Sequence, residues 1–138
     1  MSCLFCRIVA GEIPAEIIAE SEQALAFLDV MPLADGHILV IPREHAATVE
    51  EMSADSAAGV FALATSLAGP LRAAFDAAGT TIGVNDGEVT GQTVPHMHVH
   101  IVPRFAGDGA GSIHSIFKAS ATKPAGLPEV GARIRKQI

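Results

Sequence analysis

The sequence contains no tryptophan and no tyrosine, so six phenylalanines supply all of its phenyl rings. Proteins that bind single-stranded nucleic acid by stacking use several aromatic side chains beside a positively charged groove. Basic residues are also few, nine against fifteen acidic ones, which gives a formal net charge of −6. We therefore expect no nucleic-acid partner. A single nucleotide stays compatible with this composition, because a few local hydrogen-bond donors can hold it.

The sequence also lacks a run of about 20 apolar residues of the kind that a membrane helix needs. Its beginning shows no charged segment followed by a long apolar run, as a secretory signal peptide would. We therefore expect a cytoplasmic protein with no membrane partner. Only two cysteines are present, Cys3 and Cys6, in a C-x-x-C spacing. In the cytosol this spacing indicates metal binding or redox chemistry before a structural disulfide.

What is present is typical of a globular protein, with 49% hydrophobic and 17% charged residues. The length predicts a single domain over residues 1–138. Strands are expected at 17–20, 24–28, 37–42, 80–85 and 96–102, and helices at 3–10, 53–78 and from about 128 onward. Short strands joined by polar turns favour an antiparallel sheet, and hence an α+β fold.

The long helix at 53–78 carries signals at both ends and in its middle. Ser53 is expected to cap its beginning and Gly79 its end. Pro70, after Gly69, is expected to kink or split it, because proline removes a backbone donor. One apolar face is predicted at helical spacing, formed by Val60, Leu63, Leu67 and Leu71.

The most informative segment is the alternating sequence HMHVHIV at residues 96–102. Side chains alternate along a strand, so His96, His98 and His100 are expected to share one face. The intervening Met97, Val99 and Ile101 are expected to point into the core. A surface strand that merely carries histidines is the alternative to a functional face.

Two kinds of chemistry fit three histidines on one face. Histidine is a common metal ligand, but His96 and His100 would lie about 13 Å apart along a strand, too far to share one ion. Only adjacent pairs could chelate the same metal. Alternatively, a neutral imidazole can attack phosphorus and form a covalent intermediate, while its neighbours donate hydrogen bonds to the phosphate or leaving group. The polar loop before the strand, with Gly87 and Gly91, is typical of phosphate-binding backbone.

Residues 91–102, with the sequence GQTVPHMHVHIV, resemble the signature of the histidine triad family. The similarity extends to residues 13–18, 26–30 and 36–42, which follow the order of the Hint branch, and it covers roughly residues 3–105. The stretch from 85 to 108 also resembles the Fhit branch. The family resemblance implies a five-stranded antiparallel sheet with packed helices, continued across a homodimer.

The resemblance also implies a nucleotide bound beside the histidines, with reaction at its α-phosphorus. His98 would be the nucleophile, and His100 would hydrogen-bond the α-phosphate or the leaving group. His96 would support the site from the start of the strand, and His37 would hydrogen-bond the triad.

Further binding roles follow from the same family resemblance. Asp29 would bind the ribose hydroxyls, and the alternative is a plain turn residue before Pro32. The phosphate would be contacted by Thr93, the Gly91 backbone, Asn85 and Gln92. Asn85 could also be a strand-end cap. Phe27 and Ile18 would line the base pocket, or could be only core residues, as apolar strand residues usually are.

Some bacterial members of the family share an N-terminal C-x-x-C that binds structural zinc with two histidines. The matching residues here are Cys3, Cys6, His45 and His96. Such a set is a closed tetrahedral site, so it has no open position for catalysis. The alternative is two buried thiols beside an exposed histidine.

Taken together, the residues and the resemblance predict a hydrolase or nucleotidyl transferase acting on purine nucleoside 5′-phosphoramidates. It would proceed through a nucleotidyl-histidine intermediate, and catalysis would need no cofactor. The nearest alternative is a dinucleoside polyphosphate hydrolase. A zinc-dependent hydrolase that uses the histidine face as ligands and a nucleotide-binding regulatory module with little turnover also remain open.

Overall fold

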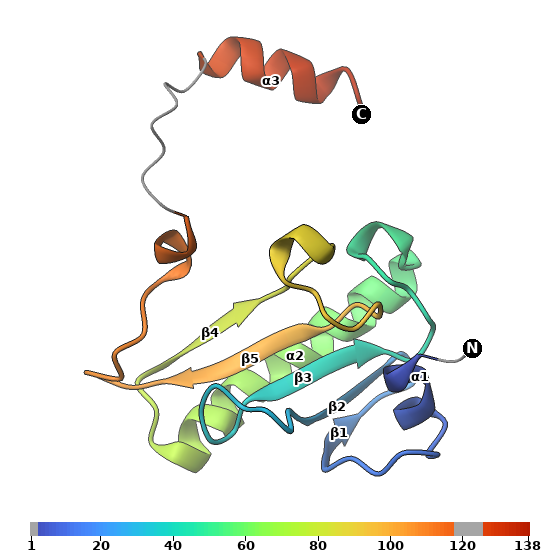
Figure 1. The fold of residues 1–138 in the computed structure, drawn as a ribbon, viewed down its shortest axis with the longest axis vertical. Coiled ribbons are helices and arrows are strands. Elements are labelled where there is room, and N and C mark those ends of the chain that lie inside the picture. Colours follow the sequence, from blue (N-terminus) through green and yellow to red (C-terminus); the bar gives the residue numbers. More distant parts are fainter. Residues whose placement is uncertain (1–2, 118–125) are drawn as a thin grey trace. The chain divides into compact units, whose positions relative to one another are not determined.

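The computed structural model describes residues 3–117 and 126–138 of the chain. It divides into two compact units, one up to Asp108 and the other from Gly109. One domain over residues 1–138 therefore stays a prediction. The first unit holds a five-stranded sheet in the order β1-β2-β3-β5-β4, antiparallel throughout (Figure 1). Its strands are β1 (Ile17–Glu20), β2 (Ala24–Leu28), β3 (Ile38–Pro42), β4 (Gly79–Gly83) and β5 (Val99–Arg104). The predicted α+β fold is confirmed.

Helix α2 (Ala54–Phe75) begins where the sequence predicts. The Ser53 hydroxyl accepts a hydrogen bond from the Ser56 N–H at 3.1 Å, which satisfies one of the unpaired donors of the first turn. The predicted end at Gly79 is wrong. The helix stops at Asp76, which adopts the left-handed conformation with φ of 51°. Aspartate tolerates this conformation better than most residues, which lets the chain turn early and leaves Gly79 free to start β4.

Pro70 does not split α2, which continues through it to Phe75. Pro70 lies on the exposed side of the helix, so the carbonyl that it leaves unpaired, four residues earlier at Ser66, faces solvent. Water can bond that carbonyl, and the cost of an interior proline is therefore reduced. The prediction of a split helix overlooked this position on the solvent side.

Helix α2 covers one face of the sheet, as Figure 1 shows. The predicted face is confirmed, since Val60, Leu67 and Leu71 are buried and Leu63 is partly buried against them. They pack on the strand residues Ala24, Ala26, Ile38, Val40, Val99 and Ile101. By length and composition alone α2 could cross a membrane. Its apolar stripe is instead occupied by the sheet, as in the core helix of a globular fold.

The opposite face of the sheet carries a second, smaller apolar cluster. It is formed by Phe5 of helix α1 (Leu4–Val9) and the strand residues Leu25, Phe27, Leu39 and Ile41. These residues alternate along β2 and β3 with those that face α2, as a strand period of two requires. In the register Leu39 lies opposite His100, so this is also the face of the histidines.

Two 3₁₀ turns complete the first unit, η1 (Val49–Glu51) and η2 (Glu88–Thr90). The second unit contains the 3₁₀ turn η3 (Ile113–Ile116) and helix α3 (Leu127–Arg135), close to the predicted final helix.

Candidate active site and metal centre

The histidine segment alternates as predicted, but less of it is regular strand. Met97, Val99 and Ile101 are buried in the cluster under α2, and the three histidines lie on the other face. Strand β5 begins at Val99, not at His96. Before it, the Met97 N–H donates to the Ala46 carbonyl at 2.7 Å, so this stretch pairs with a loop rather than with a strand. Pro95 lacks an N–H and interrupts any regular ladder there.

His98 is oriented by a single short hydrogen bond. Its Nδ1 lies 2.7 Å from the backbone carbonyl of His96, and a carbonyl can only accept. Nδ1 therefore carries the proton, and Nε2 keeps a free lone pair. The Phe5 ring stands at 89° to the His98 ring with centroids 5.3 Å apart, so the ring is also fixed by packing. His98 Nε2, the nitrogen with the free lone pair, therefore points away from this hydrogen bond.

His37 and His100 are linked by hydrogen bonds that place their protons on Nε2, the opposite nitrogen from that in His98. The Leu33 N–H donates to His37 Nδ1 at 3.1 Å, so His37 carries its proton on Nε2. That nitrogen lies 2.9 Å from His100 Nδ1 and donates to it. His100 must then carry its own proton on Nε2, which is buried and has no hydrogen-bond partner among the described residues. A buried donor without a partner is costly, which indicates a missing acceptor such as a phosphoryl oxygen.

The surroundings of His37 and His100 keep both imidazole rings neutral. Burial, followed by the neighbouring His98 and His37 rings, lowers the pKa of His100 to about 4. Burial also lowers the pKa of His37, although the Asp29 carboxylate, 3.7 Å from His37 Nδ1, opposes this shift. Both imidazoles are therefore neutral near pH 7, as the assignment of one proton to each ring requires.

A pocket of about 360 Å³ opens beside His98 and His100. Its polar lining comes from Asp29, Thr93 and the two histidines, and the rest is apolar. A mainly apolar cavity with a few convergent polar groups is the usual form of a small-molecule site. The apolar lining includes Leu4, Phe5, Ile8, Phe27, Leu39 and Val94.

Of the other predicted nucleotide-binding residues, some line the pocket and some do not. Phe27 is buried in the core and also lines the pocket, so both of its alternative roles apply. Asp29 lines it too, with Oδ1 accepting the Met31 N–H at 2.9 Å. Ile18 is 43% exposed on β1 and is not part of the pocket lining. Asn85 is exposed and also lies outside that lining.

The loop before the histidines is held by its own side chains. Gln92 accepts a hydrogen bond from the Gly87 N–H at 2.7 Å and donates to the carbonyls of Ala47 and Val94. Gly91 has a positive φ of 98°, and its N–H bonds the Glu88 carbonyl. These two residues shape the loop, and of the predicted phosphate-binding residues only Thr93 lines the pocket.

Sequence reasoning missed most of the apolar pocket lining, including three residues of helix α1. Leu4, Phe5 and Ile8 line the pocket, and Phe5 packs on the His98 ring. Their apolar spacing at 4, 5 and 8 on a short helix was the available signal, but it could not show which part of the sheet α1 covers.

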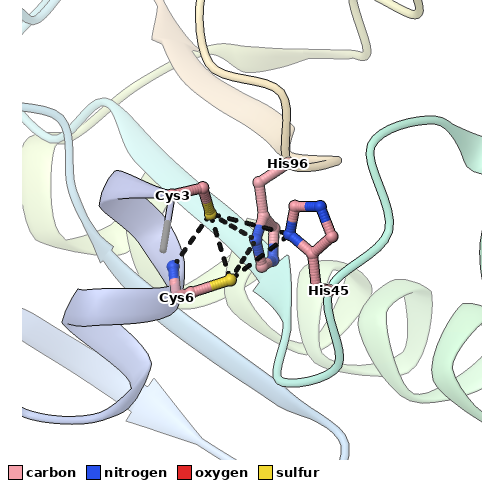
Figure 2. Close-up of side chains that lie close together, drawn as sticks. All are labelled: Cys3, Cys6, His45 and His96. Atoms are coloured by element: carbon pink, nitrogen blue, oxygen red, sulfur yellow. Dashed lines mark hydrogen bonds between the residues drawn. The ribbon is translucent and has the colours of Figure 1, made fainter. Parts of the chain in front are cut away.

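The second cluster joins Cys3 and Cys6 to His45 and His96, all pointing toward one another in Figure 2. The thiols come from α1 and its N-cap, His45 from the loop after β3, and His96 from the segment before β5. Each sulfur lies 3.3–3.6 Å from the Nδ1 atoms of both histidines. Zinc bonds of 2.3 Å to sulfur and 2.0–2.1 Å to nitrogen put tetrahedral ligands about 3.4–3.8 Å apart, so these distances fit.

The tautomer of His96 also favours a metal at this cluster. His96 Nε2 lies 2.9 Å from the Pro42 carbonyl, so it carries the proton and leaves Nδ1 free to bind an ion. The two sulfurs lie 3.0 Å apart, well beyond a disulfide bond but closer than the roughly 3.8 Å between two thiolates on one zinc ion, so they would move apart on binding. Two thiolates and two imidazoles form a closed zinc set, and His98 is not among them.

A family model supplies the deciding comparison, since the model for the HIT domain matches residues 10–107. The chain belongs to the HIT family, that of the histidine triad proteins. A HIT family protein from Bacillus subtilis has a crystal structure that is 37% identical, with a TM-score of 0.87, covering 100% of this chain and 98% of that one. Adenosine 5′-monophosphoramidase hnt1 of Schizosaccharomyces pombe is 41% identical over 75% of each chain.

A zinc-bound histidine triad protein from Mycobacterium smegmatis bears on the cysteine cluster. Its crystal structure is 37% identical to this chain, with a TM-score of 0.74, and covers 99% of this chain and 92% of that one. Within this HIT chain, the histidine triad therefore divides between two sites. His96 belongs to the four-residue cluster, and His98 and His100 belong to the pocket.

Proposed function

We propose that this HIT protein cleaves purine nucleoside 5′-phosphoramidates at the α-phosphorus, as a hydrolase or nucleotidyl transferase with His98 as nucleophile. The main observation behind the proposal is that His98 and His100, at the same pocket, carry their protons on opposite ring nitrogens. His98 offers a lone pair on Nε2, and His100 offers a proton on Nε2 without a protein acceptor. A phosphoryl group between them would receive the nucleophile and a hydrogen bond together.

In the first step His98 Nε2 forms a bond to the α-phosphorus, and the bond from phosphorus to the leaving nitrogen breaks. The leaving amine takes its proton from solvent, because the pKa of about 4 keeps His100 from being charged near neutral pH. His100 instead donates a hydrogen bond to a phosphoryl oxygen. The phosphorylated His98 ring is positively charged, and its Nδ1–H bond to the His96 carbonyl stabilises that charge.

In the second step water attacks the same phosphorus and the bond to Nε2 breaks. The attacking water loses one proton to solvent, a nucleoside monophosphate leaves, and His98 returns to its neutral form with its proton still on Nδ1. One difficult displacement is thereby replaced by two easier ones. No metal or organic cofactor is needed in either step.

The pocket supports a nucleoside next to the phosphate position. Asp29 would accept hydrogen bonds from the ribose hydroxyls, and Thr93 would donate to a phosphate oxygen. Phe27 and the apolar residues of α1 would contact the base. Gln92 and Gly91 would act indirectly, by shaping the loop that carries Thr93. Asn85 would contact the phosphate from beside that loop.

We also infer a homodimer, a structural zinc at the cysteine cluster and a cytoplasmic location. The edge strand β4 lies at the end of the sheet order, and its Ile82 is 42% exposed. Pairing of this edge with the same edge of a second copy would cover β4 and Ile82 in each copy and would continue the sheet. The two free thiols and their histidine neighbours suit a reducing compartment, where zinc rather than a disulfide would join them.

The test is release of AMP from adenosine 5′-phosphoramidate by wild-type protein and by the His98→Asn variant, with a metal chelator present in both. Asparagine keeps a polar side chain of similar reach but cannot form the intermediate. We expect turnover by the wild type and a loss of at least about 10³-fold in the variant.

Equal rates in the two proteins would contradict a nucleophilic role for His98. Wild-type turnover that occurs only when the chelator is left out, and that the His98→Asn variant retains under that condition, would favour a zinc-dependent hydrolase. Turnover of dinucleoside polyphosphates but not of the phosphoramidate would keep the mechanism and change the substrate class.

A further inference from the structure

Helix α1 separates the cysteine cluster from the pocket and contributes to both. Cys3 and Cys6 lie beside His45 and His96, while Leu4, Phe5 and Ile8 line the pocket. Leu4 and Phe5 are the two residues between the cysteines in sequence. Any force that fixes the two thiols therefore also fixes these two pocket-lining side chains.

Few bonds connect α1 to the rest of the fold. Among the described residues, its hydrogen bonds to the sheet and its loops are the contacts of the two thiols with His45 and His96 (Figure 2). The backbone bonds at its end stay within residues 3–13. Thiol–imidazole contacts of this length are weak by themselves. Four metal–ligand bonds at the same positions would be much stronger.

Phe5 is the side chain of α1 that contacts the His98 ring, so a shift of α1 would also shift the packing around His98. It is 5% exposed and stands edge-on to His98, with ring centroids 5.3 Å apart. It also contacts the His96 ring at 5.9 Å and the Phe27 ring at 5.4 Å. One ring therefore touches a metal-cluster histidine, the nucleophile and the wall of the pocket.

We propose that zinc binding and nucleotide binding reinforce each other through Phe5, which acts as a positioning residue for His98. With the four ligands fixed, α1 holds Phe5 against His98 and completes the apolar wall of the pocket. Without them, α1 is held mainly by packing, and the pocket is less often complete. This inference rests on the proposed function, because it takes a nucleoside monophosphate as the pocket's ligand.

Thermodynamic linkage makes the coupling reciprocal. If zinc raises the affinity for AMP by some factor, AMP must raise the affinity for zinc by the same factor. The effect can therefore be measured from the zinc side, by titrating a chelator into the zinc-loaded protein. It also needs no catalytic activity.

The experiment measures the equilibrium distribution of zinc between the protein and a chromogenic chelator, with and without saturating AMP, after titration calorimetry has shown that AMP binds. We expect AMP to raise the zinc affinity about tenfold, within the usual range of coupling between sites. Inorganic phosphate at the same concentration serves as a control, since it does not fill the apolar part of the pocket. It should leave the zinc affinity within about twofold.

The matched variant is Phe5→Leu, which keeps an apolar side chain and both cysteines. Its zinc affinity without AMP is measured as its own reference, because Phe5 also contacts the His96 ring. The ratio of zinc affinities with and without AMP should fall below about twofold in the variant. A wild-type zinc affinity that AMP does not change, although AMP binds, would overturn the coupling and leave the proposed function intact. An equal ratio in wild type and variant would overturn the role of Phe5. Absence of AMP binding to the loaded wild type would overturn both the coupling and the proposed function.

Discussion

The two faces of the sheet differ in what covers them and in what they expose. One face lies under the 22-residue helix α2, and the cluster between them is mainly apolar, with Ser56 as a buried polar residue of the helix. The other face lies under the six-residue helix α1 and carries His98 and His100, the pocket and the route to the cysteine cluster. Strand β5, like β2 and β3, contributes alternate residues to both faces.

This difference indicates that one face mainly stabilises the fold and that the other holds the groups proposed for catalysis. The α2 face supplies most of the apolar burial and hence the stability, because hydrophobic stabilisation scales with buried apolar area. The α1 face contains buried imidazoles, which lower stability unless they are bonded, and which provide the chemistry. If the division is correct, substitutions on one face should change activity, and those on the other should change the free energy of unfolding.

The largest expected effect is on the α1 face. His100→Leu removes the buried hydrogen-bond donor at His100 Nε2, and we expect kcat to fall about 10²–10³-fold, as when one hydrogen bond to a developing oxyanion is lost. The measurement is steady-state AMP release together with urea unfolding of the same preparation. The unfolding free energy at pH 7 should fall by only about 1–3 kcal/mol, because His37 Nε2 loses its acceptor. A variant that lost stability but kept its kcat would contradict the assignment of activity to this face.

On the α2 face, Leu67→Ala should cost about 2–4 kcal/mol of unfolding free energy, because it leaves a cavity between helix and sheet. The kcat of the folded fraction should stay within about twofold. Urea denaturation checks the first value. Leu127→Ala, at a residue that is 85% exposed in α3, is the control and should cost less than about 0.5 kcal/mol. Similar losses in both variants would contradict the assignment of the core.

The pKa of His100 predicts a pH dependence of stability. Its pKa is about 4 in the folded protein and about 6.5 in the unfolded chain, so the unfolded state binds its proton first as pH falls. This contribution is complete above about pH 6.5 and is lost between about pH 6.5 and 4, on the order of 1–3 kcal/mol. Urea midpoints across that range should fall less steeply for His100→Gln than for the wild type. Some slope should remain from His37, whose pKa is also lowered. Parallel slopes for both proteins would show that His100 is not held neutral by the fold.

The smallest effect concerns the start of α2. Ser53→Ala removes the hydroxyl that caps the helix and should lower the unfolding free energy by about 1 kcal/mol without a change in kcat. Thr65→Ala is a suitable control, because its hydroxyl bonds the Ala62 carbonyl within the exposed part of the same helix. Alanine favours a helix interior, so thermal unfolding of that control should not occur earlier than in the wild type.

Local patterns predicted the parts of the molecule that depend on local physics. Strands β1 and β2, the cap at Ser53 and the shared face of the three histidines all follow from spacing and side-chain chemistry. The end of α2 was missed because Asp76 and Gly79 both tolerate a turn, and only the packing of the following strand decides between them. The late start of β5 depends on a loop partner at Ala46, which no periodicity reveals.

The candidate site shows the same limit. The resemblance indicated the roles of His98, His100 and His37, but the assignment of a proton to each ring needed three dimensions, because it depends on the Leu33 N–H and the His96 carbonyl. Phe5 and its contact with His98 were not predicted, since nothing in a short helix shows what it covers. The closeness of Cys3 and Cys6 to His45 and His96 spans up to 93 positions and depends on the folded sheet.

The most direct test of the account is to trap the nucleotidyl intermediate. Zinc-loaded protein would be mixed with adenosine 5′-phosphoramidate, quenched within one turnover in base, where phosphorylated imidazoles survive, and digested for peptide mass spectrometry. The account predicts one added adenylyl group on the peptide that contains residues 96–100, with fragmentation placing it on His98, and none in His98→Asn. An adenylyl group on another residue, or rapid AMP formation with no modified peptide under the same quench, would contradict His98 as the nucleophile.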